Sequence, residues 1–161
     1  YDIVFGDWSS VVCSSDLPFV LIGFVDMMLV MLVAVYWFKV PIYGNILLLF
    51  ALTAVFLFTS LGLGLFISTI SHTQQQASMS SFFLMMPSIL LSGFMFPIAN
   101  MPQIIQYITY LIPLRYFLVI VRGIFLKGNT AAELWPQIIP LAALGIAIML
   151  LSSLRFRKRL G

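Results

Sequence analysis

The chain has 161 residues, of which 62% are hydrophobic and only 8% are charged, and its formal net charge is +3. So few charges cannot cover the surface of a soluble domain of this size, which excludes an ordinary globular protein and indicates a multi-pass membrane protein. Basic residues gather at Arg155, Arg157, Lys158 and Arg159 directly after an apolar run. Such a cluster is typical of the cytoplasmic flank of a membrane span, so no nucleic-acid partner is expected.

Residues 1–17 are expected to be an N-terminal segment foreign to the rest of the chain. Residues 7–17 read DWSSVVCSSDL and resemble a conceptual translation of a sequencing-adaptor oligonucleotide, from which they differ at Val11. An ordinary loop rich in Ser and Asp is the alternative. Cys13, the single cysteine, lies here, so no disulfide within the chain is expected. The natural protein is expected to resume near Pro18 and to occupy residues 18–161.

Four apolar stretches are long enough to cross a hydrocarbon core of about 30 Å as helices. They cover approximately residues 17–38, 46–70, 77–96 and 134–154. The first stretch contains Asp26, for which a near-interface or packing role and a role in transport chemistry both stay open. The third contains Pro87, where the lost helical hydrogen bond predicts a kink that is either structural or a hinge.

Small residues recur along the second stretch at helical spacing. Ser60, Gly64 and Ser68 follow one another at four-residue intervals, and Gly62 lies beside them. Such a row forms a shallow groove where another helix can approach closely. These four residues are therefore predicted to serve helix packing, either within the chain or at a dimer face.

The strongly polar connection between two spans is SHTQQQ, residues 71–76. It is expected to be a cytoplasmic loop containing His72, Gln74, Gln75 and Gln76. His72 has no Cys, Asp or Glu beside it in the sequence, so no metal site is expected.

Residues 102–127 are apolar but contain Arg115 and Arg122. A central arginine costs about 2.5–3.5 kcal/mol in a membrane span even on lenient scales, so a simple crossing is unfavourable. The pattern predicts a re-entrant or interfacial pair of short helices divided at Pro113, with Lys127 and Gly128 at its end. Anchoring at the membrane interface and direct contact with a substrate both stay open for the arginines.

The fold class predicted from these elements is an all-α membrane protein. It has four transmembrane helices and a re-entrant or interfacial helical pair before the last one. Because the sequence contains no GxxxxGK[ST], HExxH or GxSxG motif, no catalytic residue and no cofactor bound by this chain are expected.

Several segments together resemble the C-terminal half of a bacterial permease of the type-2 ABC exporter class. The segments are SLGLGLFISTISHTQQQA at 60–77, PSILLSGFMFP at 87–97, NMPQIIQYITYLIPLRYF at 100–117, RGIFLKG at 122–128, LWPQIIPLAALG at 134–145 and LRFRKRL at 154–160. The resemblance implies a six-span permease with an external domain and a cytoplasmic coupling segment. Neither of these precedes Pro18 here, so a truncated subunit is expected.

The resemblance also implies partners and a location. A cytoplasmic ABC ATPase subunit would bind ATP and magnesium and hydrolyse ATP. A second permease, identical or different, would complete a dimer in the lipid bilayer, with a periplasmic adaptor as an optional further partner. The location implied is the bacterial inner membrane, with a cytoplasmic C-terminus.

The function that follows is export of a substrate, which the sequence does not identify, out of the cytoplasm. A secondary transporter and a non-transporting membrane scaffold are the alternatives; the former needs intramembrane ionisable groups and usually an internal repeat. A substrate path or gate is hypothesised at Pro87, Ser92, Gly93, Pro97, Arg115 and Arg122. The resemblance implies that the Met95–Arg122 region forms the external gate and the re-entrant helices.

Overall fold

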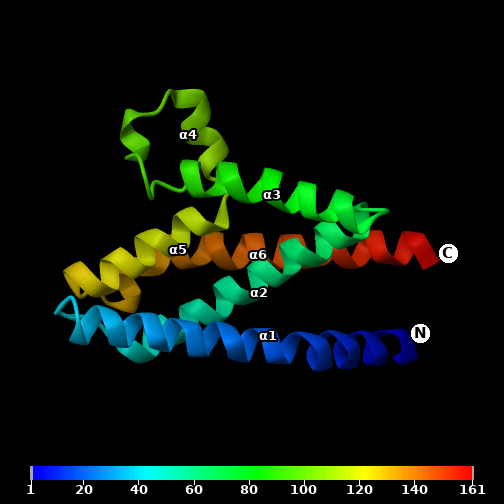
Figure 1. Cartoon of the computed structure of the whole chain (residues 1–161), viewed down its shortest axis with the longest axis horizontal. Helices are drawn as coiled ribbons and strands as arrows, with labels where there is room; N and C mark the ends of the chain where they lie inside the picture. The colour runs from blue at the N-terminus through cyan, green and yellow to red at the C-terminus, as the bar shows by residue number, and fades with distance from the viewer. Residues whose placement is uncertain (1, 161) are drawn as a thin grey trace. The chain divides into compact units, whose positions relative to one another are not determined.

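The computed structural model describes the backbone of residues 2–160 and the side chains of residues 17–155. Every regular element in this part of the chain is a helix, which confirms the predicted all-α class (Figure 1). The chain divides into two compact units, Tyr1–Pro41 and Ile42–Gly161. The side chains of Cys13 and of the basic residues after Arg155 lie outside the described part.

The first unit is a single helix, α1 (Asp2–Tyr36), which contains a candidate membrane span over Leu17–Tyr36. The helical backbone passes through residues 7–17, so the alternative of a loop there is wrong, whereas the foreign origin of the segment stays a prediction. Lys39, with φ +51°, then turns the chain away from the helix axis.

In the second unit, α2 (Ile46–Ile70) packs side by side with α6 (Ala131–Leu160), and the two helices run in the same direction (Figure 1). Their approach depends on small residues. A Cβ built on Gly145 of α6 would lie 2.6 Å from the Oγ1 of Thr59, a fully buried residue of α2. Further along, a Cβ on Gly62 would lie 3.1 Å from the sulfur of Met149. The two backbones are therefore as near as these side chains permit.

Two further elements complete the core of this unit: α5 (Pro113–Arg122) and the π-helical turn η2 (Gly123–Lys127). The rings of Phe56 and Phe117 stack between α2 and α5 with their centroids 4.3 Å apart. Ile120 and Ile124 are fully buried, and Leu134 of α6 is 2% exposed. Burial of these side chains fixes α5 and η2 against the α2–α6 pair.

The turn η2 interlocks with the chain that leads into α2. Gly128 closes η2 with φ +64°, and a Cβ there would lie 2.8 Å from the Cβ of Tyr43. In the same contact, a Cβ on Gly44 would lie 2.7 Å from the backbone oxygen of Ile124. The absence of a side chain at Gly128 and Gly44 therefore lets the η2 segment and the segment before α2 approach each other closely. The helix stop predicted at Gly128 is confirmed.

α3 (Gln74–Leu91) lies beside these helices without a single buried residue of its own. The sequence predicted its span at residues 77–96. The helix begins earlier because Thr73 is its N-cap, accepting a hydrogen bond from the Gln76 amide at 3.2 Å. It ends at Leu91, since Gly93 with φ +85° cannot continue it.

Within the described residues, three helices are long and apolar enough to cross a membrane: Leu17–Tyr36, Ile46–Ile70 and Ala131–Arg155. The number rises to four if the bent pair Gln103–Thr109 and Pro113–Lys127 counts as one span. α3 does not qualify by composition, because the glutamines of its first turn lower its hydropathy. The last helix is longer than the predicted 134–154.

Candidate functional site

The candidate site lies where α3 gives way to the re-entrant element, defined here as residues 103–127. A 3-10 turn, η1 (Ile98–Asn100), and α4 (Gln103–Thr109) follow α3, and α5 comes next (Figure 1). α4 and the Pro113–Lys127 segment are bent by 85° relative to each other. The predicted division at Pro113 is confirmed, since proline is well placed as the first residue of a new helix.

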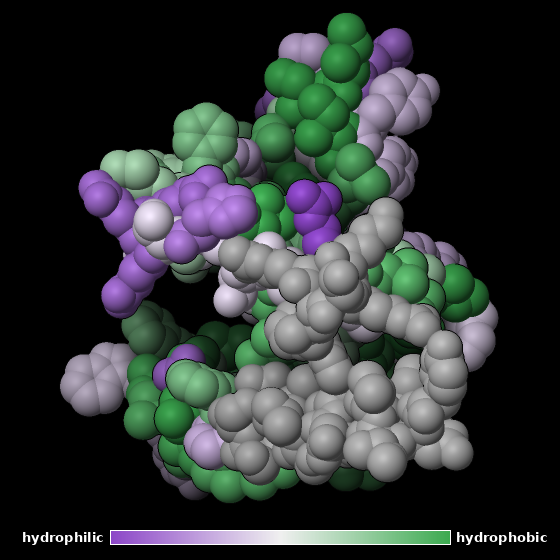
Figure 2. All heavy atoms as spheres, turned by 90° about the vertical axis from the view of Figure 1, so that its right-hand side faces the viewer, coloured by the Kyte–Doolittle hydropathy of each residue, from purple (hydrophilic) through white to green (hydrophobic). Residues whose placement is uncertain are grey.

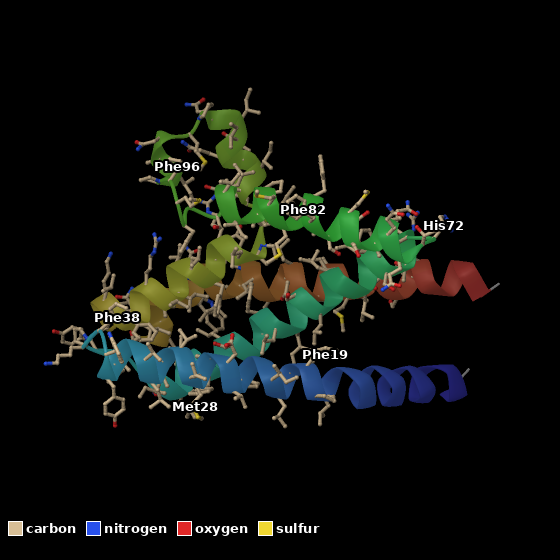
Figure 3. All side chains as sticks on the ribbon, viewed as in Figure 1. Phe19, Met28, Phe38, His72, Phe82 and Phe96 are labelled. Carbon is tan, nitrogen blue, oxygen red and sulfur yellow. The ribbon has the colours of Figure 1, made fainter. Side chains whose placement is uncertain are left out.

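The connection from α3 to α4 is built by turn residues. Ser92 is 3% exposed, and its hydroxyl donates to the Ile89 carbonyl at 2.8 Å. Gly93 then takes its left-handed conformation, and Pro97 precedes the turn η1. Figure 3 shows His72 and Phe96 at opposite ends of α3, so this connection and the α2–α3 turn lie at opposite ends of that helix.

Arg122 links α5 to this connection. Its Nη2 donates a hydrogen bond to the carbonyl oxygen of Gly93 at 3.3 Å, although the two residues are far apart in the sequence. Arg122 is exposed apart from this contact. Both residues belong to the candidate gate predicted from the sequence, and the fold brings them together.

Arg115 points elsewhere, towards the last turn of α4. Its Nη1 donates to the Oγ1 of Thr109 and, at 3.5 Å, to the carbonyl of Gln106. Its Cζ lies 4.1 Å from the centroid of the Tyr110 ring, a cation–π contact. The adjacent Tyr116 hydroxyl donates to the Tyr110 carbonyl at 2.8 Å. We call Gln106, Thr109, Tyr110, Arg115 and Tyr116 the elbow cluster.

Pro87 and Pro97 do not join these contacts. Pro87 is exposed within α3, and the helix continues through it to Leu91. The hydroxyl of Ser88 donates to the Leu84 carbonyl at 2.6 Å beside the proline. The six residues proposed from the family resemblance therefore separate into an Arg122–Gly93 contact with Ser92 beside it, an Arg115 contact directed to α4, and two exposed prolines.

The predicted packing residues also divide. Gly62 is buried against α6, as described above, whereas Ser60, Gly64 and Ser68 are exposed. A Cβ on Gly64 would meet nothing within 4 Å. The row of small residues thus faces away from α6, and its use at a dimer face stays a prediction.

The predicted polar loop is shorter than residues 71–76. Gln74, Gln75 and Gln76 form the first turn of α3, because the Gln76 side chain accepts a hydrogen bond from the His72 amide at 3.0 Å and so reinforces the Thr73 cap. All four predicted loop residues are exposed. Figure 2 looks onto the end of the second unit with this turn and shows hydrophilic surface gathered there.

Sequence reasoning missed Thr109, Tyr116 and Gly44. Thr109 is fully buried and Tyr116 is 6% exposed, yet both look like ordinary residues of an apolar stretch. The available signal was the pair Arg115–Tyr116 directly after Pro113, because a proline-started helix directs its first side chains back towards the preceding segment. Nothing in the sequence marked Gly44 beyond its place in a turn.

Comparisons with known proteins decide the family. A model described as ABC-2 type transporter matches residues 5–126, which is most of the chain and includes nearly all of the re-entrant element. The chain belongs to the ABC-2 type transporter family. The type-2 ABC resemblance derived from the sequence is confirmed.

Curated members of the ABC-2 family align with most of this chain. It is 40% identical over 147 residues to the probable multidrug ABC transporter permease YbhS of Escherichia coli K12, covering 89% of this chain and 38% of that protein. YbhR of the same organism is 32% identical over 124 residues, covering 77% and 34%. The E. coli inner membrane transport permease YhhJ is 34% identical over 122 residues, covering 76% and 33%.

This ABC-2 family chain therefore spans between a third and two fifths of the length of these relatives. No solved structure matches it. Apolar helices and membership of a permease family make it a multi-pass membrane protein.

Proposed function

We propose that the chain forms part of the transmembrane permease subunit of an ATP-driven ABC exporter, which moves a substrate out of the cytoplasm. The observation that carries this proposal is the family match over residues 5–126. The three relatives described above are themselves named permeases. A helical pair bent by 85° between long apolar helices is an arrangement suited to a permeation path rather than to a simple anchor.

On this proposal, ATP and magnesium bind to a separate cytoplasmic ABC ATPase, where hydrolysis takes place. The sequence of this chain offers no phosphate-binding loop of its own. A second permease, identical or different, completes the dimer, and a periplasmic adaptor is a further partner. Nucleotide-driven closure of the ATPases shifts the permeases between inward- and outward-facing arrangements.

The location proposed is the bacterial inner membrane, with the C-terminus in the cytoplasm. The dense basic sequence after Leu154 supports this orientation. The α2–α3 turn at Ser71–Thr73 then also faces the cytoplasm, where its exposed polar residues suit contact with an ATPase subunit.

The Ser92–Pro97 connection then serves as the external gate. Its support is the hydrogen bond from Arg122 to the Gly93 carbonyl, which joins the end of α3 to the re-entrant element. Because Gly93 has φ +85°, a side chain there strains the turn. Gly93→Ala should impair export and leave the ATPase bound.

The test uses the complete gene that encodes this chain, expressed with a C-terminal tag. We expect an ATP-binding subunit to purify with it in stoichiometric amounts. Drug efflux from cells is the first transport assay, because two relatives are named multidrug permeases. Efflux should disappear when the ATPase gene is deleted or when its nucleotide site is inactivated.

Two results would contradict the proposal. Purification without an ATPase, together with efflux that follows the proton gradient, would identify a secondary transporter. Stable membrane expression without an ATPase and without transport of any drug, lipid, polysaccharide or peptide tested would favour a scaffold.

A further inference from the structure

The bend of the re-entrant element is closed by side chains from its second half. Two consecutive residues of α5, Arg115 and Tyr116, reach back across Pro113 and end on acceptors of the last turn of α4. The guanidinium of Arg115 meets the Thr109 hydroxyl and the Gln106 carbonyl, while the Tyr116 hydroxyl meets the Tyr110 carbonyl. The two carbonyls are backbone groups of the kind that a helix C-terminus leaves without partners within the helix.

Thr109 acts as the connection between the cation and the backbone. Its hydroxyl donates to the Gln106 carbonyl at 2.6 Å and accepts from Arg115, so both of its hydrogen-bonding functions are used. It is fully buried and is the only buried residue of α4. A positive charge at a helix C-terminus is also favourable with respect to the helix dipole.

The other contacts of α4 are limited: it touches α3, and the Gln106 side chain donates a hydrogen bond to the Met101 carbonyl at 2.8 Å. α4 contains seven residues, which is too short for a helix to be stable on its own in water. Ile104, Tyr107 and Ile108 are all substantially exposed, so apolar packing does not fix its direction. The elbow cluster therefore supplies side-chain hydrogen bonds that join α4 to α5 across the 85° bend, in addition to the backbone bonds from the Leu111 and Ile112 amides to the Ile108 and Thr109 carbonyls.

We infer that Arg115 is a positioning residue that holds α4 and α5 at a fixed angle. The bend at Pro113 is therefore rigid and does not act as a hinge. The two pieces then move together whenever the re-entrant element moves. Tyr116 supplies a second, weaker brace. This inference rests on the geometry of the elbow cluster and does not depend on the proposed export function.

The test measures the local motion of α4 by electron paramagnetic resonance of a nitroxide label, using the complete protein in lipid nanodiscs. The label is attached at Ile104→Cys on α4 or at Val119→Cys on α5, both exposed positions, with other cysteines replaced by serine. Arg115→Gln should make the α4 label several-fold more mobile and leave the α5 label unchanged. Lys127→Gln is the matched control, because this exposed cation forms no hydrogen bond or ion pair within the described residues.

A second pair of variants tests the connection without touching the charge. Thr109→Val keeps the shape but removes the hydroxyl, so it should mobilise the α4 label, whereas Thr109→Ser should restore the immobile spectrum. In the double variant Arg115→Gln with Thr109→Val, the increase in mobility should be smaller than the sum of the two single increases, since both changes remove the Arg115–Thr109 bond. Arg115→Lys should be intermediate because lysine lacks the planar fork of donors.

The inference is overturned if the α4 label stays immobile in both Arg115→Gln and Thr109→Val. It is also overturned if the labels on α4 and α5 loosen equally, because Arg115 would then support the whole unit and not the corner. Should Arg115→Gln fail to fold, the Thr109→Val and Thr109→Ser pair decides alone.

Discussion

Gly145 and Gly64 are both helical glycines, but a methyl group would meet quite different surroundings at the two positions. At Gly145 it would lie 2.6 Å from the Thr59 hydroxyl, which is fully buried and already donates to the Val55 carbonyl at 2.9 Å. At Gly64 it would meet nothing within 4 Å. Replacing glycine by alanine at the two positions therefore distinguishes the effect of close packing on stability from the effect of helix propensity.

We predict that Gly145→Ala destabilises the protein by about 1–3 kcal/mol, the usual effect of overpacking. Gly64→Ala should be neutral or stabilising by up to about 1 kcal/mol, because alanine favours the helix. Thermal inactivation of the detergent-solubilised protein, followed by size-exclusion chromatography, measures both. Adding Thr59→Ala to Gly145→Ala should recover part of the lost stability, because it removes the side chain that the new methyl group meets. If stability is not recovered, contact with Thr59 is not the cause of the loss.

At the scale of elements, the interlock of Gly44 with Ile124 and of Gly128 with Tyr43 joins η2 to the start of α2. We predict that Gly128→Ala costs more than about 1–2 kcal/mol, since the left-handed conformation alone accounts for that amount and the contact with Tyr43 adds to it. Gly44→Ala should also destabilise, because the Ile124 backbone oxygen cannot move aside as a side chain can.

Thermal melting of the single and double variants checks this prediction. Because both glycines belong to one contact, the loss in the double variant should be smaller than the sum of the two single losses. Additive losses would show that the two sides of the interlock form independently.

Helix breaks were readable from the sequence because Pro113 and Gly128 act through their own backbone chemistry. The beginning of α3 was misplaced because Thr73 and Gln76 form a cap that a polar run conceals. The partners of the two arginines were not predictable: whether Arg115 faces water, substrate or Thr109 depends on a corner that exists only after α4 and α5 have folded. Gly44 likewise matters only through a distant segment.

At the scale of the whole molecule, we expect the distribution of cations along the sequence to set the orientation in the membrane. Arg155, Arg157, Lys158 and Arg159 stand together, while Lys39, Arg115, Arg122 and Lys127 are spread along the other side in the proposed topology. Arg115 donates a hydrogen bond to Thr109 of α4, and Arg122 donates one to the Gly93 carbonyl. We therefore give these two cations less weight than free loop cations when the two sides of the membrane are compared. The basic C-terminus should therefore stay in the cytoplasm.

Fusion reporters test the orientation. We predict that green fluorescent protein fused after Gly161 fluoresces and that alkaline phosphatase fused there is inactive. Phosphatase fused after Gly128 should be active. The reverse pattern at both sites would invert the topology and place the α2–α3 turn outside the cell.

The pairing of α2 with α6 has a consequence for biosynthesis. The two helices are neighbours in space, yet the ribosome makes all of α3, α4 and α5 between them. At about 5–20 residues per second, α2 waits on the order of several seconds before its partner emerges. During that time Thr59 and Gly62 face lipid or the insertion machinery instead of Gly145 and Met149. A nascent chain that stops before α6 therefore leaves this face of α2 without its packing partner.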